Sequence, residues 1–363
     1  MTDNKKPKYR QLIDYLIGQI EAGIVQPGEQ IYSENELAAR FQISRHTVRQ
    51  ALGEMVNAGW LYRVHGKGTF VRERRRRKVP SKKIGVIITY LNDYIFPAII
   101  RGIDQVLAAN GYNIILSCTY NQHEKELICL ENMLGQHIDG LIVESTKSAL
   151  PNPNLDLYRE LENQGVQLLF IHGRYQDLDC SYVVEDDLEA GYLATQHLLA
   201  LGHRKIGGLF KVDDIQGHYR WAGFQKAHRE AGLKVKDAQV VWFDTAEADE
   251  SEDLFRSGRF RGMLSECTAV VCYNDLQALQ LLDVLREQGL RVPEDLSVVG
   301  FDDSQLAVSS EVKLTTVVHP KEQLGMEAAR RMLALINEGS PQKVMMRPEL
   351  IIRESTARLP VKE

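Results

Sequence analysis

The sequence predicts an α/β protein with a small, mainly helical N-terminal domain and a larger body of two doubly wound α/β subdomains. Two patterns lead to this prediction. Residues 1–71 hold short helical patterns that end in a β-like segment, and from residue 84 short apolar runs alternate with helical patterns almost to the last residue. Residues 72–83 carry a dense basic run and a proline. We therefore expect domains at 1–71 and 84–363, joined by a basic linker.

The composition is that of an ordinary folded protein, but the charge is divided unevenly along the chain. With 363 residues, 44% of them hydrophobic and 26% charged, the sequence excludes wholesale disorder, a collagen-like repeat and a small disulfide scaffold. The formal net charge is −5, yet residues 1–80 hold 15 Lys and Arg against 8 Asp and Glu, whereas residues 81–363 hold 29 against 41. A basic N-terminal part before an acidic body indicates a polyanionic partner for that part.

Cysteines, histidines and the N-terminus bear on compartment and cofactors. The five cysteines show no Cys-x-x-Cys spacing, which favours reduced, buried thiols in a reducing compartment, and the histidines lack the spacing of a metal site. The first eleven residues are charged without an apolar stretch, and no apolar run has the length of a membrane span. We expect a cytoplasmic protein without metal, cofactor or membrane contact.

The N-terminal domain begins with two predicted helices. Apolar side chains recur at helical spacing from Tyr9 to Ile20, and Gly23 follows where that helix is expected to end. Ser33 then precedes a short helical pattern and is followed three residues later by Glu36. This spacing is typical of a capping box, in which each of the two residues binds the backbone of the other.

A third helix and two strands complete this domain. Ser44 is the expected N-cap of the third helix, and Gly59 its end. Residues 60–71 have the pattern of two strands joined by a glycine-rich turn at 65–68. Three helices followed by a small hairpin predict a winged helix-turn-helix domain.

Such a domain places its third helix in the major groove of double-stranded DNA, where the N-terminal residues of the helix reach base edges and phosphates. Each basic residue taken singly is as readily a solvated surface charge, and it is the ordered combination that favours DNA. The candidates comprise the start of the third helix, the start of the second helix and the turn of the hairpin: Arg45, His46, Thr47, Arg49, Glu34, Asn35, His65, Gly66 and Lys67.

Residues 8–71 also resemble the DNA-binding domain of GntR-type repressors. The resemblance rests on PGEQIYSENELA (27–38), SRHTVRQAL (44–52) and GWLY with GKGTFV (59–71), and Tyr32 stands where that family typically has proline. It implies DNA contacts by Glu34, Arg45, His46, Thr47, Arg49, His65 and Gly66, and a phosphate contact by Lys8.

The body has two series of strand-like apolar runs separated by helical patterns. The first series covers 84–89, 112–118, 139–144 and 166–172, and the second covers 205–210, 238–243, 268–273 and 296–301. Near-continuous apolar strands alternating with helices indicate parallel sheets covered on both faces. Two series predict two subdomains with a cleft between them, and ligands of such folds bind at the carboxyl ends of the strands.

Polar and aromatic side chains follow these runs, and together they suit the hydroxyl groups and ring faces of a monosaccharide. Alternatives remain open, because Asn274 and Asp302 could cap the following helices, His172 could be an interior imidazole, and Tyr94 and Phe96 could belong to the core. The candidate effector contacts are Tyr94, Phe96, Glu144, Lys147, His172, Glu185, Tyr273, Asn274 and Asp302.

The body resembles the LacI/GalR-type regulators and the periplasmic sugar-binding proteins. The motifs are HLLALGHRKI (197–206), RWAGF (220–224), CYNDLQAL (272–279) and GLRVPEDLSVVGFDD (289–303). The resemblance implies a periplasmic-binding-protein-like effector domain in which Arg220, Asn274 and Asp302 contact the effector. Glu144, His172 and Glu185 occupy pocket positions of that family.

A GntR-type domain before a LacI-type body resembles the arabinose-responsive repressors. Besides SRHTVR, the segments at 91–103, 137–150 and 348–355 carry this resemblance, which implies L-arabinose as the effector. A repressor of the same architecture that senses another pentose or hexose is the alternative.

We therefore expect a sugar-responsive repressor that binds operator DNA as a homodimer. The rival interpretations are a sugar-metabolising enzyme and a transport receptor. The first would need a phosphate loop, a metal cluster or an activated nucleophile, which the sequence patterns do not contain, and the second would need an export signal.

Overall fold

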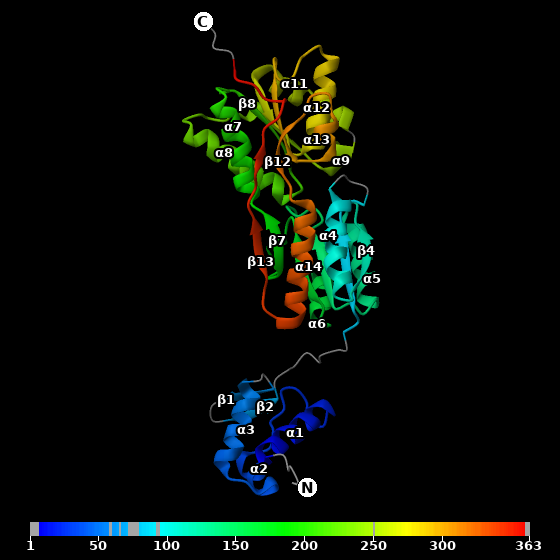
Figure 1. Ribbon diagram of the computed structural model, residues 1–363, viewed down its shortest axis with the longest axis vertical. Coiled ribbons are helices and arrows are strands. Elements are labelled where there is room, and N and C mark those ends of the chain that lie inside the picture. The colour runs from blue at the N-terminus through cyan, green and yellow to red at the C-terminus, as the bar shows by residue number, and fades with distance from the viewer. Residues whose placement is uncertain are drawn as a thin grey trace. The chain divides into compact units, whose positions relative to one another are not determined.

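The computed structural model describes residues 7–57, 60–64, 67–71, 80–91, 95–249 and 251–359 (Figure 1). Its contacts divide the chain into two compact units, Met1–Val79 and Pro80–Glu363, which are called the head and the body below. No helix within the described ranges combines the length and the apolar character that crossing a membrane requires.

The head has the predicted order of three helices and a hairpin. They are α1 (Lys8–Glu21), α2 (Glu34–Phe41), α3 (Arg45–Asn57), β1 (Leu61–Val64) and β2 (Gly68–Val71). The strands pair antiparallel with Leu61 opposite Val71, and side chains from all five elements form one apolar core. The predicted capping box is confirmed, because Ser33 Oγ accepts from the Glu36 backbone N–H at 3.3 Å and Glu36 Oε2 accepts from the Ser33 N–H at 2.7 Å.

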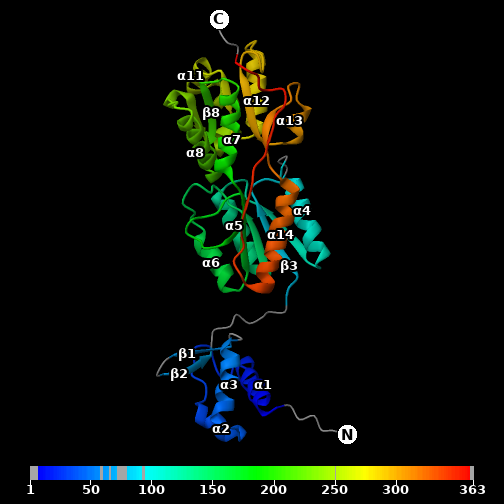
Figure 2. The same ribbon diagram turned by 60° about the vertical axis from the view of Figure 1, so that its left-hand side comes forward.

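The body contains two α/β subdomains, each built around a six-stranded sheet (Figures 1 and 2). The first subdomain consists of β3 (Lys83–Ile88), α4 (Phe96–Ala109), β4 (Asn113–Cys118), α5 (His123–Gly135), β5 (Gly140–Glu144), α6 (Leu155–Asn163), β6 (Gln167–Ile171), β7 (Ser181–Glu185), α14 (Lys321–Glu338) and β13 (Lys343–Met346). Its strand order is β13-β7-β6-β5-β3-β4, and every neighbouring pair is parallel.

The second subdomain has the strand order β14-β12-β11-β10-β8-β9, in which only the β12–β14 pair is antiparallel. It consists of α7 (Asp187–Ala200), β8 (Ile206–Lys211), α8 (Ile215–Glu230), η1 (Asp237–Gln239), β9 (Val240–Phe243), α9 (Thr245–Asp249), α10 (Ser251–Arg256), α11 (Gly258–Glu266), β10 (Ala269–Val271), α12 (Asp275–Glu287), β11 (Ser297–Asp302), α13 (Gln305–Ser309), β12 (Thr315–Val318) and β14 (Leu350–Ile351).

Each sheet buries both faces, as the near-continuous apolar runs predict. Neighbouring residues of β3 point to opposite faces, so Val86 joins the apolar cluster under α4 and α14, whereas Ile87 joins the cluster under α5 and α6. In the second sheet Val270 packs with α11 and α12, and Val271 packs with α7 and α8.

The chain passes between the two subdomains three times, after β7, after β12 and after β13. As a result α14 and β13 belong to the first subdomain although they lie near the end of the sequence. Both views show α14 beside α4 (Figures 1 and 2), and Gly102 and Gly325 sit where a Cβ atom would meet the backbone of the opposing helix. The strand series predicted from the sequence is confirmed, but it does not include β7, β12 or the C-terminal strands.

Candidate functional site

The start of α3 presents a basic surface on the head. The side chains of Arg45, His46 and Arg49 are exposed, whereas Thr47 is half-buried and its Oγ1 lies 2.8 Å from Ser44 Oγ. The Thr47 backbone N–H donates to Ser44 Oγ at 3.1 Å, which confirms Ser44 as the cap of the helix. The cationic side chains therefore surround the positive end of the helix dipole, which favours an anion.

Glu34 and Arg49 form an ion pair that joins α2 to α3. Arg49 Nη2 lies 2.9 Å from Glu34 Oε2, and Arg49 Nε lies 3.3 Å from Oε1. The hydrogen bond from Arg49 lowers the pKa of the Glu34 carboxyl below its usual range. In this geometry Glu34 orients the guanidinium of Arg49.

The remaining predicted head residues lie apart from this pair. Asn35 and Lys67 are exposed, and Lys8 Nζ donates to the Gln42 carbonyl at 3.3 Å, at the C-terminal end of α2. The hairpin-tip candidates His65 and Gly66 lie outside the described residues.

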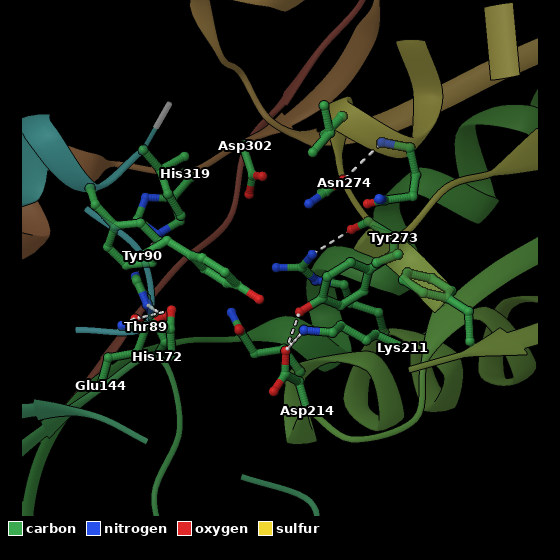
Figure 3. Close-up of a pocket in the computed structure, with 18 of the residues that line it drawn as sticks. Thr89, Tyr90, Glu144, His172, Lys211, Asp214, Tyr273, Asn274, Asp302 and His319 are labelled. Atoms are coloured by element: carbon green, nitrogen blue, oxygen red, sulfur yellow. Dashed lines mark hydrogen bonds and ion pairs between the residues drawn. The ribbon is translucent and has the colours of Figure 1, made fainter. Parts of the chain in front are cut away.

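The body has a cavity of about 370 Å³ between its subdomains (Figure 3). The carboxyl ends of β3, β5, β6, β8, β10, β11 and β12 all contribute to its wall. The lining comprises Thr89, Tyr90, Leu91, Ile95, Phe96, Tyr120, Glu144, His172, Lys211, Asp214, Gln216, Arg220, Phe243, Ala248, Tyr273, Asn274, Leu276, Gln277, Asp302 and His319.

Glu144 and two histidines form one polar wall of the cavity. Glu144 Oε2 accepts from the Thr89 backbone N–H at 2.7 Å and from Thr89 Oγ1 at 2.5 Å, and Oε1 lies 3.0 Å from His172 Nδ1. Burial by itself would lower the pKa of His172, but the bond to Glu144 outweighs burial and raises it.

His319 continues this wall from the strand connection after β12. Its Nε2 lies 2.8 Å from His172 Nε2, so one ring donates to the other. Burial and the neighbouring His172 lower the pKa of His319 well below its usual value. The lowered pKa favours the neutral form of the His319 ring.

The opposite wall holds a buried arginine. Arg220 is 4% exposed, and its Nε donates to Asp187 Oδ1 at 2.8 Å while Nη1 donates to the Tyr273 carbonyl at 2.5 Å. Burial works against its charge, but the Asp187 carboxylate outweighs this and raises the pKa of Arg220. Gly191 allows α7 and α8 to pack closely beside Arg220. A Cβ atom at this position would meet the Arg220 carbonyl and hold the two helices apart.

A second cation and its partners lie at the end of β8. Lys211 Nζ lies 2.7 Å from Asp214 Oδ2, which also accepts from the Tyr273 hydroxyl at 3.4 Å. Burial disfavours the charged form of Lys211, but Asp214 compensates and the pKa rises. The cavity therefore presents charged groups of both signs that are already paired with each other.

The structure decides between the alternatives left open for two predicted contacts. Asn274 does cap α12, since its Oδ1 accepts from the Gln277 N–H at 3.0 Å, and it also lines the cavity. Its Nδ2 group therefore remains to donate to a ligand. The alternative that Asp302 caps a helix does not hold, because Ser304 is the N-cap of α13, and Asp302 lines the cavity with a φ of +103°.

The structure brings most of the predicted effector contacts together, namely Phe96, Glu144, His172, Arg220, Tyr273, Asn274 and Asp302. Among the described candidates, Lys147 and Glu185 do not line this cavity. Glu185 lies behind it with Oε2 3.5 Å from His319 Nε2, and burial together with the charge of Asp187 raises the pKa of Glu185 to about 8. Tyr94 lies outside the described residues.

Polar lining residues that the sequence reasoning missed include Thr89, Lys211, Asp214, Gln216, Gln277 and His319. Thr89, Lys211 and Asp214 end or follow runs that were recognised as strands, so the same strand-end rule would have found them. His319 follows β12, whose short TTVV pattern was not recognised as a strand.

A winged helix-turn-helix head joined to a body with a polar cavity between two subdomains defines a ligand-responsive transcription regulator. Two family models match the chain, "Bacterial regulatory proteins, gntR family" over residues 8–71 and "Periplasmic binding protein-like domain" over residues 195–356. The chain is 45% identical to an arabinose metabolism transcriptional repressor of Halalkalibacterium halodurans, with 96% of each chain covered. It is 43% identical to the protein of that name from Geobacillus stearothermophilus, with 99% and 100% covered.

The protein therefore belongs to this family of transcriptional repressors, in which a GntR-type head precedes a LacI-type body. Solved structures of transcriptional regulators have similar folds. A complex of the transcriptional regulator CelR with cellobiose matches with a TM-score of 0.66 and 27% identity over 86% of this chain and 92% of that one. A LacI family transcriptional regulator from Enterococcus faecium with bound ribose matches with a TM-score of 0.64 and 26% identity over 77% and 100%.

Proposed function

We propose that this repressor binds operator DNA through its head and is released when L-arabinose occupies the cavity of the body. The observation that carries the proposal is the cavity of about 370 Å³ between the subdomains, lined by paired polar groups from both of them. Its volume lies near the lower end of the range of about 300–1,000 Å³ for ligand pockets, as a monosaccharide requires. The names of the relatives supply the choice of L-arabinose among sugars.

The charges of the cavity favour a neutral polyol over an ion. Glu144, Asp214 and Asp302 are acidic, whereas Lys211 and Arg220 are basic, and neither sign dominates. Carboxylates accept from sugar hydroxyls while Lys, Arg and the Asn274 amide donate to them. Tyr90, Phe96 and Tyr273 supply aromatic faces for the ring. Because these polar groups are buried, a sugar with the wrong hydroxyl pattern would leave some of them unpaired.

A second cavity of about 640 Å³ is a less suitable sugar site. It lies beyond His172, Glu185 and Asp187, and exposed apolar side chains, among them Leu150, Tyr219 and Met345, line it. A polar ligand needs convergent buried groups to replace its water shell. The smaller cavity offers those groups.

On the DNA side we propose that Arg45, His46, Thr47 and Arg49 enter the major groove from α3, with Glu34 orienting Arg49. Asn35, Lys67, His65 and Gly66 would contact the duplex beside them, and Lys8 a phosphate. We further propose that residues 1–71 are the DNA-binding domain, 72–83 the basic linker and 84–363 the effector and dimerisation domain. A homodimer would place two heads on a near-palindromic operator, since the two-fold symmetry of the protein mirrors that of the site.

Release follows from coupling between the two sites. Sugar that contacts both walls stabilises the closed arrangement of the subdomains, and a dimer so constrained no longer holds its heads at the spacing of the operator. A typical coupling free energy of about 1–3 kcal/mol corresponds to a change of about 5–150-fold in operator affinity. By reciprocity, operator DNA weakens sugar binding by the same factor.

The test is a titration of operator DNA with the full chain in the presence and absence of sugar. An operator is first selected from random duplexes by binding, and its affinity is then measured by fluorescence anisotropy with L-arabinose, D-ribose, D-xylose or D-glucose. We expect only L-arabinose to weaken binding. No change at saturating sugar would refute effector-controlled release, and a response to another sugar would correct the ligand.

A further inference from the structure

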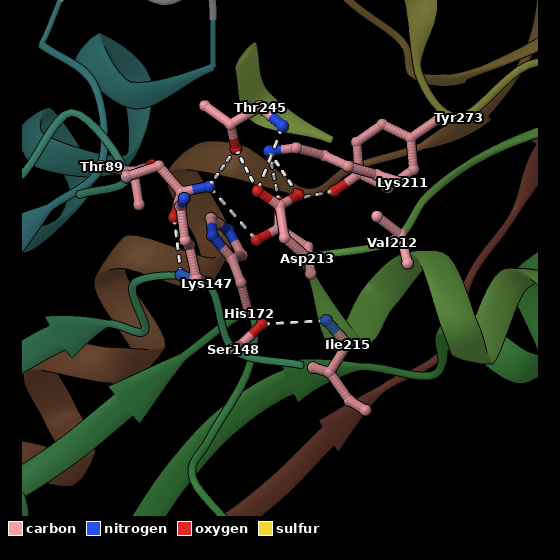
Figure 4. Close-up of polar contacts among 12 residues, drawn as sticks. Thr89, Lys147, Ser148, His172, Lys211, Val212, Asp213, Ile215, Thr245 and Tyr273 are labelled. Atoms are coloured by element: carbon pink, nitrogen blue, oxygen red, sulfur yellow. Dashed lines mark hydrogen bonds and ion pairs between the residues drawn. The ribbon is translucent and has the colours of Figure 1, made fainter. Parts of the chain in front are cut away.

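Polar contacts join the two subdomains at loops away from the three strand connections (Figure 4). In the first subdomain these loops are residues 119–122 after β4 and 145–150 after β5, and in the second they are residues 212–215 after β8 and the start of α9. The Ile215 N–H donates to Ser148 Oγ at 2.9 Å, and the Ala149 N–H donates to the Asp213 carbonyl at 3.1 Å. Because none of these loops connects the subdomains covalently, such bonds break when the loops move apart.

Asn121 is a side chain of the first subdomain that forms hydrogen bonds across this contact. It is 1% exposed, and its Oδ1 accepts from the Lys147 N–H at 2.7 Å, which fixes the orientation of the amide. Its Nδ2 then donates across the cleft to Thr245 Oγ1 at 2.7 Å and lies 3.5 Å from Asp214 Oδ1. Asn121 has a φ of +52°, a left-handed conformation that asparagine tolerates better than most residues.

Thr245 links Asn121 to the buried carboxylate of Asp213. Its Oγ1 accepts from Asn121 and therefore directs its own proton to Asp213 Oδ2, at 2.6 Å. The Thr245 backbone N–H donates to the same oxygen at 3.1 Å. Asp213 is 2% exposed. The three side chains form a directed chain of hydrogen bonds from the first subdomain into the second.

These hydrogen bonds lie next to residues that line the cavity. Lys211 and Asp214 line the cavity, and Lys211 Nζ lies 3.8 Å from Asp213 Oδ1 while Asp214 faces Asn121. Asn121, Asp213 and Thr245 are not among the residues that line the cavity of about 370 Å³, and Asn121 lines a small pocket beside it. A ligand that orders Lys211 and Asp214 therefore also orders the loop that carries Asp213.

We propose that Asn121, Thr245 and Asp213 form a cross-cleft latch, a set of positioning residues that hold the body closed around its ligand. The proposal rests on the proposed sugar-binding function and adds the elements that set how long the sugar stays bound. Because the latch forms only after the subdomains meet, it stabilises the closed complex and has no part in the encounter of sugar with the open cleft. Its loss therefore accelerates sugar dissociation and leaves association unchanged.

The test compares variants of the full chain with L-arabinose as the probe. Asn121→Ala removes the donor, and Thr245→Val removes the hydroxyl at nearly constant volume. Isothermal titration calorimetry gives the dissociation constant, and stopped-flow tryptophan fluorescence gives both rate constants. Loss of one net hydrogen bond predicts about fivefold to tenfold faster dissociation, with the association rate constant within twofold of wild type.

Two further variants separate the latch from general effects on the fold. Thr245→Ser restores the hydroxyl and is expected to restore wild-type dissociation. Thr195→Val removes another buried hydroxyl, which donates to the Gly191 carbonyl at 2.7 Å inside α7, and serves as the control with unchanged sugar kinetics. The double variant Asn121→Ala/Thr245→Val is expected to dissociate no faster than the faster single variant, because both changes remove the same bond. Thermal unfolding establishes that each variant is folded.

The outcomes distinguish this proposal from the proposed function. If the wild-type chain binds L-arabinose and the latch variants dissociate at the wild-type rate, or lose association instead, the latch is overturned and the sugar-binding function stands. Additive effects of the two substitutions on the dissociation rate would likewise contradict the proposal that both residues act through one bond. If the wild-type chain binds no L-arabinose, the proposed function fails and the latch fails with it.

Discussion

The head and the body present their candidate binding residues in opposite ways. In the head, Arg45, His46 and Arg49 are exposed on the first turns of a single helix, and local capping by Ser44 orients them. In the body, Arg220 and His172 are buried and already bound to other side chains before any ligand enters. A long, charged duplex can be met by an open surface, whereas a small neutral molecule must be enclosed by groups held in place by their neighbours.

This difference has an energetic consequence. An exposed cation loses little water on folding and contributes little to the stability of the head. A buried cation depends on its partner, so removal of one member leaves an uncompensated charge. Substitutions at the DNA surface should therefore affect binding alone, and those at the cavity wall should affect both binding and stability.

Arg220→Ala should have the largest effect. We expect it to abolish release of operator by sugar and to destabilise the body by about 3–5 kcal/mol, because Asp187 loses the only ion-pair partner that the described contacts give it. Operator affinity of the folded protein should stay near wild type. The measurements are anisotropy titration with and without sugar and thermal unfolding.

Arg229→Ala, an exposed arginine of the same helix, is the matched control and should change neither property. Arg220→Lys keeps the positive charge, and it replaces the alanine variant in the release assay if that variant is unfolded. Sugar-induced release by a folded Arg220 variant would contradict the assignment of the cavity.

Arg45→Ala should weaken operator binding by about 1–3 kcal/mol if the guanidinium reads a guanine, and should relax specificity at one base pair. Stability should not change, in contrast to Arg220. The comparison is anisotropy with the selected operator and with variants of it at single positions. An equal loss on every sequence would identify a phosphate contact instead.

The pH dependence of stability should change in Glu185→Gln. Burial raises the pKa of Glu185 to about 8 in the folded protein, against an unfolded value of about 4.3. Between these values the unfolded chain releases a proton that the folded chain keeps. The free energy of unfolding therefore loses up to about 1.4 kcal/mol per pH unit as the pH rises through this window.

The glutamine variant keeps His172, His319 and Asp187 and lacks only this ionisation. Its unfolding free energy should fall less steeply between pH 5 and 8 than that of the wild type, as followed by denaturant titration at several pH values. Parallel curves for the two proteins would show that Glu185 ionises normally.

Ser33→Ala should have the smallest effect, about 1 kcal/mol, through loss of the cap of α2. Because the head is a unit of its own, only its unfolding transition should shift in calorimetry. Ser257→Ala is the matched change in the body, since Ser257 caps α11, and it should shift only the transition of the body. A shift of both transitions by either variant would show that the two units unfold together.

Much of the fold and part of the cavity could be predicted from local sequence patterns. The spacing of Ser33 and Glu36 predicted a helix cap. The rule that ligands bind at the carboxyl ends of strands predicted Glu144, His172 and Asp302 as site residues. His319 and Asn121 could not be found in this way, because their roles depend on residues 147 and 124 positions away along the chain. Lys147 follows a strand and was predicted as a ligand contact, yet its backbone N–H holds Asn121.

The sequence by itself determined the helices, caps and strands, the uneven charge and the two kinds of domain, because each depends on residues close together in the chain. Only the tertiary structure decided which of the strand-end side chains meet. Three passages between the subdomains carry α14 and β13 back to the first sheet, and they place His319 against His172. The physical reason is burial, since a polar group removed from water takes its partners from whatever the fold brings near it, at any distance along the sequence.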